Sequence, residues 1–199
     1  MLFRSRNEWT ALDRVISADL AYLKAKLKGD ISVTSQTDAN DAWIVEVDST
    51  TASIATYRYD RTTKALAKLF VSRPELEGET LAAMIPIEIQ SRDGLTLVSY
   101  LTLPPASDPN GNGRPDKPVP MVLSVHGGPW SRDVYGYYGL HQWLANRSYA
   151  VLSVNFRGST GFGKAFVSAG DLEWGAKMQD DLIDAVDWAI AAGITTSSL

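Results

Sequence analysis

The stretch from Val119 to Gly163 constrains the fold of this 199-residue chain more than any other part of the sequence. Two apolar runs rich in β-branched residues, 119–125 and 149–156, each lead into a glycine turn. Between them, residues 137–147 have the length and period of a helix. Strand, turn, helix and strand make a βαβ unit, whose two strands are expected to be parallel and buried on both faces. In open parallel sheets, ligand-binding and catalytic residues lie at the carboxyl ends of the strands, and both glycine turns are located there.

The helical segments are expected to pack through apolar stripes at intervals of three or four residues. In 137–147 the expected apolar face consists of Leu140, Trp143 and Leu144. Residues 12–28 predict a further helix, and the segment 171–194 is expected to contain another. Their stripes are Leu12, Ile16, Leu20, Leu23 and Leu27 in the first, and Met178, Leu182, Ala185, Val186 and Ala189 in the second. Four aspartates are expected on other faces of the second: Asp180, Asp181, Asp184 and Asp187.

The N-terminal part also predicts strands. Four short runs rich in β-branched and aromatic residues are separated by turn-type clusters, and they span 31–38, 43–49, 53–60 and 65–71. Such an antiparallel meander is the unit from which propeller blades are built, and one blade cannot close a propeller. We therefore expect residues 1–83 to be a helix plus one blade-like meander, and residues 84–199 to be a second, α/β domain. The second domain opens with a hairpin turning at Arg92-Asp93-Gly94.

Composition excludes several classes of protein. A formal charge of −4 and a pI near 5.2 argue against a nucleic-acid surface, and no window is apolar enough for a membrane span. The absence of cysteine rules out disulfides, thiolate metal sites and a cysteine nucleophile. We expect a cytoplasmic protein, or a periplasmic one if a signal peptide precedes the sequence.

The strongest chemical motif is His126-Gly127-Gly128-Pro129, at the end of an apolar run. Two glycines let the backbone approach a ligand closely and aim an N–H outward, as acyl transfer requires for the oxyanion. The alternative is a tight turn without a ligand. His126 is interpreted as a structural, hydrogen-bonded histidine rather than a general base.

The second glycine turn, Arg157 to Gly163, is not a nucleophile elbow, because Gly-x-Ser-x-Gly would need glycine at position 157. Ser159 is therefore a poor nucleophile candidate. Arg157 either forms a structural ion pair or lines the cleft, and Tyr135 either lines a substrate pocket or packs in a surface loop. The calcium-like loop 108–116 lacks the acidic twelfth ligand, so no metal is expected, and no cofactor is implied.

Four motifs occur together and in order: HGGP, NFRGSTGFGK, Gly-Asp-x-x-Trp-Gly and Met-Gln-Asp-Asp-Leu. With them the chain resembles the prolyl oligopeptidase family of serine peptidases, in particular its acylaminoacyl-peptidase and dipeptidyl-aminopeptidase branch. The resemblance covers nearly the whole chain and is strongest from Ile85 onward. It implies the last blade of a β-propeller followed by the N-terminal half of an α/β-hydrolase domain.

The resemblance also implies a function. The full-length form would cleave short peptides or N-terminal aminoacyl and acylaminoacyl bonds through an acyl-enzyme, with a Ser-Asp-His triad located beyond Leu199. Gly128 would donate its backbone N–H to the oxyanion, while Gly127 and His126 shape the turn. Without the nucleophile, the isolated chain is expected to be inactive. The strand missing from the hydrolase sheet would lie beside 119–125, so the chain is also expected to self-associate through that edge. The alternatives are a non-catalytic interaction module and an esterase or lipase of the same fold.

Overall fold

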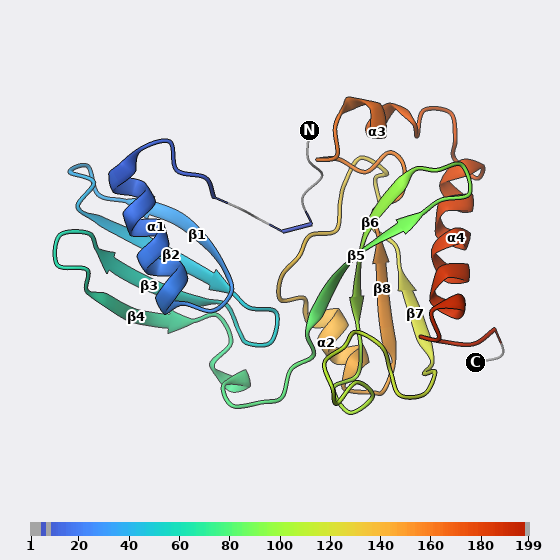
Figure 1. The fold of residues 1–199 in the computed structure, drawn as a ribbon, viewed down its shortest axis with the longest axis horizontal. Helices are drawn as coiled ribbons and strands as arrows, with labels where there is room; N and C mark the ends of the chain where they lie inside the picture. Colours follow the sequence, from blue (N-terminus) through green and yellow to red (C-terminus); the bar gives the residue numbers. More distant parts are fainter. Residues whose placement is uncertain (1–4, 7–8, 198–199) are drawn as a thin grey trace. The chain divides into compact units, whose positions relative to one another are not determined.

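The computed structural model describes residues 5–6 and 9–197, and the chain divides into two compact units (Figure 1). The first unit is Arg6–Leu81, and the second is Ala82–Leu199 together with Met1–Ser5. Within the described residues, no helix has both the length and the apolar character needed to cross a membrane.

The first unit is a helix packed on an antiparallel meander, as the sequence predicts. Its four strands pair in chain order, β1-β2-β3-β4. The elements are α1 (Arg14–Lys26), β1 (Asp30–Gln36), β2 (Ala42–Asp48), β3 (Ala55–Asp60), β4 (Leu66–Val71) and the 3₁₀ turn η1 (Pro74–Leu76). The carboxylate of Asp13 caps α1 by accepting hydrogen bonds from the N–H groups of Val15 and Ile16 at 2.8 and 3.2 Å. Leu12 precedes this cap and is fully exposed. Contrary to the prediction, it is not part of the apolar stripe.

α1 covers one face of the meander and carries a buried carboxylate (Figure 1). Asp19 has no exposed surface and accepts hydrogen bonds from the Tyr59 hydroxyl at 2.7 Å, the Arg61 Nε at 2.9 Å and the Lys64 Nζ at 2.6 Å. Burial alone would raise the pKa of Asp19, but the hydrogen bonds from Lys64, Tyr59 and Arg61 hold it below its ordinary value. Leu23 and Trp43 pack beside this network in an apolar cluster. The helix is therefore joined to the sheet by both apolar and ionic contacts.

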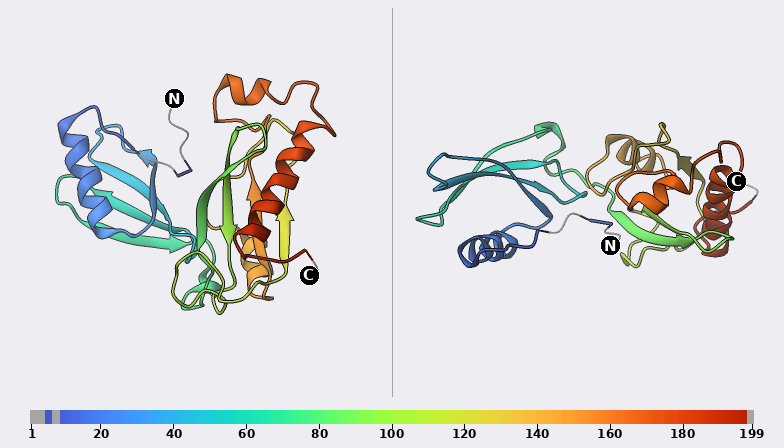
Figure 2. Two further views of the ribbon diagram at one scale, coloured as in Figure 1. Left: turned by 45° about the vertical axis from the view of Figure 1, so that its right-hand side comes forward. Right: turned by 90° about the horizontal axis from the view of Figure 1, so that it is seen from above.

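The second unit is a mixed sheet with helices on its two faces. The strand order is β5-β6-β8-β7, in which β5, β6 and β8 pair antiparallel while β7 and β8 pair parallel. The elements are β5 (Met84–Gln90), β6 (Thr96–Thr102), β7 (Met121–Ser124), α2 (Gly139–Ala145), β8 (Ala150–Val154), α3 (Lys164–Ser168) and α4 (Lys177–Ala191). α2 and α4 lie on opposite faces of the sheet (Figure 2). The predicted hairpin and the predicted parallel pair are both confirmed.

The two parallel strands differ in burial, which corrects the expectation that both are covered on both faces. All five residues of β8 are buried, because β6 and β7 flank it and helices cover it. β7 is an edge strand of the described sheet and is only partly buried along its length. Val125, which directly follows β7, is 46% exposed. The sheet therefore ends in an apolar edge.

The predicted apolar face of α2 is also wrong. Leu140 and Trp143 are 44% and 54% exposed, and the buried residues are His141 and Ala145, one turn apart. His141 is buried because its ring bridges two hydroxyls of the sheet. Its Nδ1 lies 2.9 Å from Thr102 Oγ1 on β6, and its Nε2 lies 2.9 Å from Ser153 Oγ on β8. Burial lowers the pKa of His141 to about 4.

Candidate active site

Both glycine turns lie at the same edge of the sheet. β7 and β8 are parallel, so the segments that follow Ser124 and Val154 leave the sheet at neighbouring carboxyl ends. An open pocket of about 320 Å³ lies between these turns and the segment leading into α4. The residues lining it are His126, Gly128, Pro129, Phe156, Trp174, Gly175 and Met178. The structure thus brings the two sequence-predicted turns together at one cavity.

Gly128 has a backbone conformation that requires glycine. Its φ is +127°, and a Cβ at this position would lie 2.6 Å from the backbone nitrogen of Trp130. The next peptide bond, Gly128–Pro129, is cis. Within the described part of the chain, no acceptor receives a hydrogen bond from the N–H of Gly127 or Gly128. Both glycines are exposed, so these donors are available to a ligand.

His126 contacts Ser159, which lies 33 residues further along the chain. The Nε2 of His126 is 2.8 Å from the Ser159 Oγ, and its ring stacks on Phe156 with centroids 4.7 Å apart. Its Nδ1 lies 3.0 Å from the carbonyl oxygen of Gly127. A histidine and a serine at this distance resemble a nucleophile with its base. However, Ser159 has no exposed surface, and its hydroxyl donates to the carbonyl oxygen of Phe156 at 2.6 Å. No substrate atom can reach this oxygen.

Arg157 occupies a different position from the pocket. Its side chain is only 4% exposed and lies between two carboxylates. It donates to Asp181 from Nε at 2.9 Å and from Nη2 at 2.6 Å, and to Asp93 from Nη1 at 2.9 Å and from Nη2 at 2.8 Å. These hydrogen bonds hold the pKa of Asp93 well below its usual range and raise that of Arg157. Of the two interpretations made from the sequence, this geometry favours the structural ion pair over contact with substrate.

The position of Asp181 corrects the prediction that all four aspartates lie on polar faces of α4. Asp181 is completely buried, and its Oδ2 also accepts a hydrogen bond from the backbone N–H of Arg157 at 2.8 Å. In an amphipathic helix, aspartates are expected on the face that is exposed to solvent. Here a buried guanidinium provides the partner that makes burial of a carboxylate acceptable.

The aromatic residues at the pocket differ from the predicted one. Tyr135 packs against the core with its ring centroid 6.4 Å from that of Tyr100, and it is not among the pocket residues. Instead, Trp174 lines the pocket, and Trp130 lies beside it with a centroid distance of 6.4 Å. Both indoles are more than half exposed. In the sequence, this tryptophan is marked by its place inside the Gly-Asp-x-x-Trp-Gly motif.

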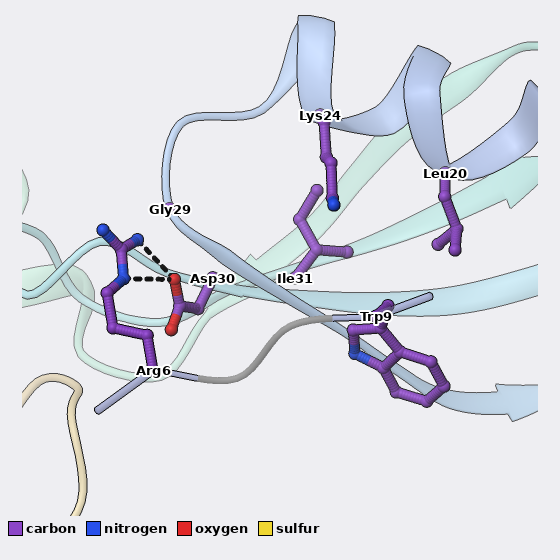
Figure 3. A pocket seen from close by; sticks show the side chains of 7 residues that line it. All are labelled: Arg6, Trp9, Leu20, Lys24, Gly29, Asp30 and Ile31. Carbon is purple, nitrogen blue, oxygen red and sulfur yellow. Dashed lines mark hydrogen bonds and ion pairs between the residues drawn. The ribbon is translucent and has the colours of Figure 1, made fainter. Parts of the chain in front are cut away.

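A second pocket, of about 240 Å³, belongs to the first unit (Figure 3). It is lined by Arg6, Trp9, Leu20, Lys24, Gly29, Asp30 and Ile31. The guanidinium of Arg6 donates to Asp30 Oδ1, with an Nε distance of 3.0 Å, so the carboxylate already has a cationic partner. None of these seven described residues is a serine, threonine or cysteine.

The calcium-like loop 108–116 is closed by hydrogen bonds within the loop. The carboxylate of Asp108, in the calcium-like loop, accepts hydrogen bonds from the N–H groups of Asn112 at 3.0 Å and Gly113 at 2.8 Å. Its oxygens therefore close the loop on itself. Across residues 5–6 and 9–197, no group of three or more His, Cys, Asp or Glu side chains is arranged to hold a metal ion.

Solved structures share this architecture. The chain aligns with a puromycin-hydrolyzing peptidase of Mycobacterium tuberculosis at a TM-score of 0.65 and 24% identity, covering 78% of this chain and 24% of that one. It aligns with an acylaminoacyl peptidase of Pyrococcus horikoshii at a TM-score of 0.60 and 21% identity, covering 82% of this chain and 25% of that one. The class is therefore a mixed α/β fold in which an antiparallel four-stranded sheet precedes a mixed sheet with helices, as in part of these peptidases.

Sequence relatives identify the family. Residues 137–198 match the model of the prolyl oligopeptidase family. The chain is 58% identical over 191 residues to dipeptidyl aminopeptidase BIII of Pseudoxanthomonas mexicana, covering 96% of this chain and 28% of the relative. It is 41% identical over 196 residues to dipeptidyl peptidase family member 6 of Caenorhabditis elegans, covering 90% and 26%. The chain belongs to the prolyl oligopeptidase family, in its dipeptidyl aminopeptidase and acylaminoacyl peptidase branch, and spans about a quarter of the length of these relatives.

Proposed function

We propose that this chain contributes the oxyanion loop and one wall of the substrate pocket to a serine peptidase that removes short N-terminal units from peptides. The observation that carries the proposal is Gly128, an exposed residue whose N–H has no acceptor among the described residues and which lines an open pocket at the carboxyl edge of parallel strands. An N–H fixed in advance at such a place stabilises the negative oxygen of an acyl-transfer intermediate. The printed names of the relatives, an aminopeptidase and a dipeptidyl peptidase, support a peptide substrate.

The same proposal assigns the two units. Residues 84–199 are the N-terminal half of an α/β-hydrolase domain, and the meander is the last blade of a propeller. The nucleophile, the acid and the histidine of the triad lie in the part of the longer form that follows this sequence. Mixed strand order, with antiparallel β5 and β6 leading into a parallel pair, supports this assignment.

A reactive-serine assay tests the proposal. The 199-residue chain should not react with a fluorophosphonate probe and should not release p-nitroaniline from aminoacyl or dipeptidyl p-nitroanilides, because Ser159 is buried and is not activated. A longer form of the protein should do both. Labelling of Ser159 in the short chain would contradict the assignment, and so would a longer form that neither reacts nor turns over.

The exposed edge of β7 favours a second property, self-association of the isolated chain. β7 pairs only with β8 in the described sheet, and the exposed Val125 directly follows this edge strand. An unprotected strand edge is a template for pairing with another chain. Sedimentation velocity over a hundredfold range of concentration should show a concentration-dependent increase in mass. A monodisperse monomer that melts cooperatively at high concentration would count against this expectation.

A further inference from the structure

The turn between β5 and β6 lies at the same edge of the sheet as the candidate active site (Figure 1). β6 pairs antiparallel with β8, and Ser99 lies opposite Val154, so the start of β6 is next to the end of β8. The carboxylate of Asp93, in this turn, accepts hydrogen bonds from Arg157 Nη1 at 2.9 Å and Nη2 at 2.8 Å. Arg157 directly follows Phe156, which lines the pocket. The hairpin turn is therefore bonded to the segment that forms one side of the pocket.

Arg157 continues this connection into α4. Its backbone N–H, Nε and Nη2 all donate to the buried carboxylate of Asp181, at 2.8, 2.9 and 2.6 Å. Asp181 and Met178 are three residues apart on α4 and so lie on the same face of that helix. Met178 lines the pocket. The contacts therefore lead from Asp93, through Arg157 and Asp181, to a wall of the pocket.

The Met178 side chain occupies space that two glycines leave open. A Cβ on Gly158 would lie 3.1 Å from the Met178 Cε, and a Cβ on Gly170 would lie 2.7 Å from it. Because these contacts are close, the place of the methyl group depends on how near α4 is held to the segment after β8. The hydrogen bonds between Arg157 and Asp181 join these same two parts of the chain.

We propose that Asp93 is a positioning residue for the pocket wall. It holds the Arg157 guanidinium against Asp181, and this pair fixes where Met178 lies in the pocket. Asp93 is not among the pocket residues, so it acts through Arg157 and not by contact with substrate. Without its carboxylate, the outer nitrogens of the guanidinium lose a bidentate partner and the plane of the group can turn. The inference rests on the proposed function for its effect on substrate binding, whereas the place of Met178 can be tested without it.

Asp180 offers a matched control. Its side chain is 39% exposed and pairs with Arg92 at 3.1 Å, and the side chain of Asp93 is 41% exposed and pairs with Arg157 at 2.8 Å. The two arginines differ, because Arg92 is 51% exposed and Arg157 is 4% exposed. Asp93→Asn and Asp180→Asn therefore remove the same charge from carboxylates of similar exposure. Only Asp93→Asn should move the pocket wall.

Nuclear magnetic resonance of the 199-residue chain with isotope-labelled methionine methyl groups tests the positioning, since the chain has only four methionines. Asp93→Asn should shift the Met178 methyl signal. It should leave the signals of Met84 and Met121, on β5 and β7, in place. Asp180→Asn should leave all three signals in place. An unchanged Met178 signal in folded Asp93→Asn, or an equal shift in Asp180→Asn, overturns the proposal.

The wild-type chain gives a second measurement, which holds even if Asp93→Asn fails to fold. The Met178 methyl group should show nuclear Overhauser contacts with the α-protons of Gly158 and Gly170, because it lies against both glycines. Absence of these contacts in the folded wild-type chain also overturns the proposal.

Kinetics of the longer form test the consequence for substrate. Asp93→Asn should raise KM for a dipeptidyl p-nitroanilide about 2- to 30-fold, the range for residues that act on a site through an intervening network. The value of kcat should change little, because a pocket wall contacts the substrate in the ground state and in the transition state alike. A merely destabilised fold would instead lower kcat by reducing the amount of active enzyme.

An unchanged KM in Asp93→Asn, with or without a loss of kcat, would contradict the positioning role. Equal increases of KM in Asp93→Asn and Asp180→Asn would contradict it as well. If the wild-type longer form has no activity, the proposed function fails, while the methyl signals still decide whether Asp93 positions Met178.

Discussion

Replacing Arg157 with methionine is expected to lower the free energy of unfolding of the second unit by about 3–5 kcal/mol. Methionine keeps much of the apolar stem but leaves Asp181, which is completely buried, without its cation. The Asp181 carboxylate would stay desolvated, and no cation would offset the free-energy cost of that desolvation. Hydrogen exchange followed by mass spectrometry measures the effect locally. Peptides from β6, β8 and α4 should lose protection, and peptides from α1 to β4 should not.

Arg92→Met is the control for the Arg157 substitution. Arg92 also binds two aspartates, Asp180 at 3.1 Å and Asp184 at 2.8 Å, but its side chain is 51% exposed. Solvent screens ion pairs of an exposed arginine, so Arg92→Met should lower the free energy of unfolding much less than Arg157→Met. If Arg157→Met and Arg92→Met lowered the free energy of unfolding equally, burial of the Arg157 ion pairs would not contribute to the effect.

The same network predicts a dependence on pH. Arg157 lowers the pKa of Asp93 in the folded chain below its unfolded value of about 4. Such a carboxyl stabilises the fold above pH 4, and this contribution is lost as the pH falls through the folded-state pKa. Removal of Arg157 should therefore make the stability fall less steeply between about pH 4 and pH 2.

Gly128→Ala is expected to lower kcat of the longer form by about 100- to 1000-fold, the usual loss when one oxyanion donor is removed. A Cβ would lie 2.6 Å from the backbone nitrogen of Trp130, and φ at this position is +127°, so the turn must move and its N–H with it. Steady-state kinetics with a dipeptidyl p-nitroanilide measures the change, which should appear mainly in kcat.

Gly127→Ala is the control that distinguishes the effect of an added methyl group from the effect of a backbone conformation that alanine cannot adopt. A Cβ at Gly127 would have no neighbouring atom within 4 Å, and its φ lies outside the left-handed region. Its loss of activity should therefore be smaller than that of Gly128→Ala. The assignment of Gly128 as the donor would be wrong if the two variants lost equal activity, or if Gly128→Ala stayed fully active.

Local patterns predicted most of the elements. Alternation and turn residues identify the meander and the hairpin, and the β-branched runs identify β7 and β8 as a parallel pair, because these signals depend on neighbours in sequence. The errors concern burial, which depends on the rest of the fold. Trp143 was expected in the core, yet the polar ring of His141 is buried instead because Thr102 and Ser153 supply hydrogen bonds. No pattern within α2 contains that information.

At the candidate site, too, local features could be predicted from the sequence and contacts between distant segments could not. The glycine turn could be predicted, since a glycine pair directly after an apolar strand is a local signature. The contact of His126 with Ser159, and the burial of Arg157 with Asp181, join segments that are 33 and 24 residues apart. Pairings of this kind arise from the βαβ crossover and the docking of α4. They become visible only when the sheet is assembled.

The pairing pattern of the two sheets has a consequence for the order in which the chain acquires structure. In the meander every strand pairs with its neighbour in sequence, so each pairing closes only a short loop. In the second unit, the centre of the sheet forms only when β6 pairs with β8. These two strands are separated in the sequence by residues 103–149. The meander has low contact order and is also synthesised first, so it can reach its native register while β8 is still inside the ribosome.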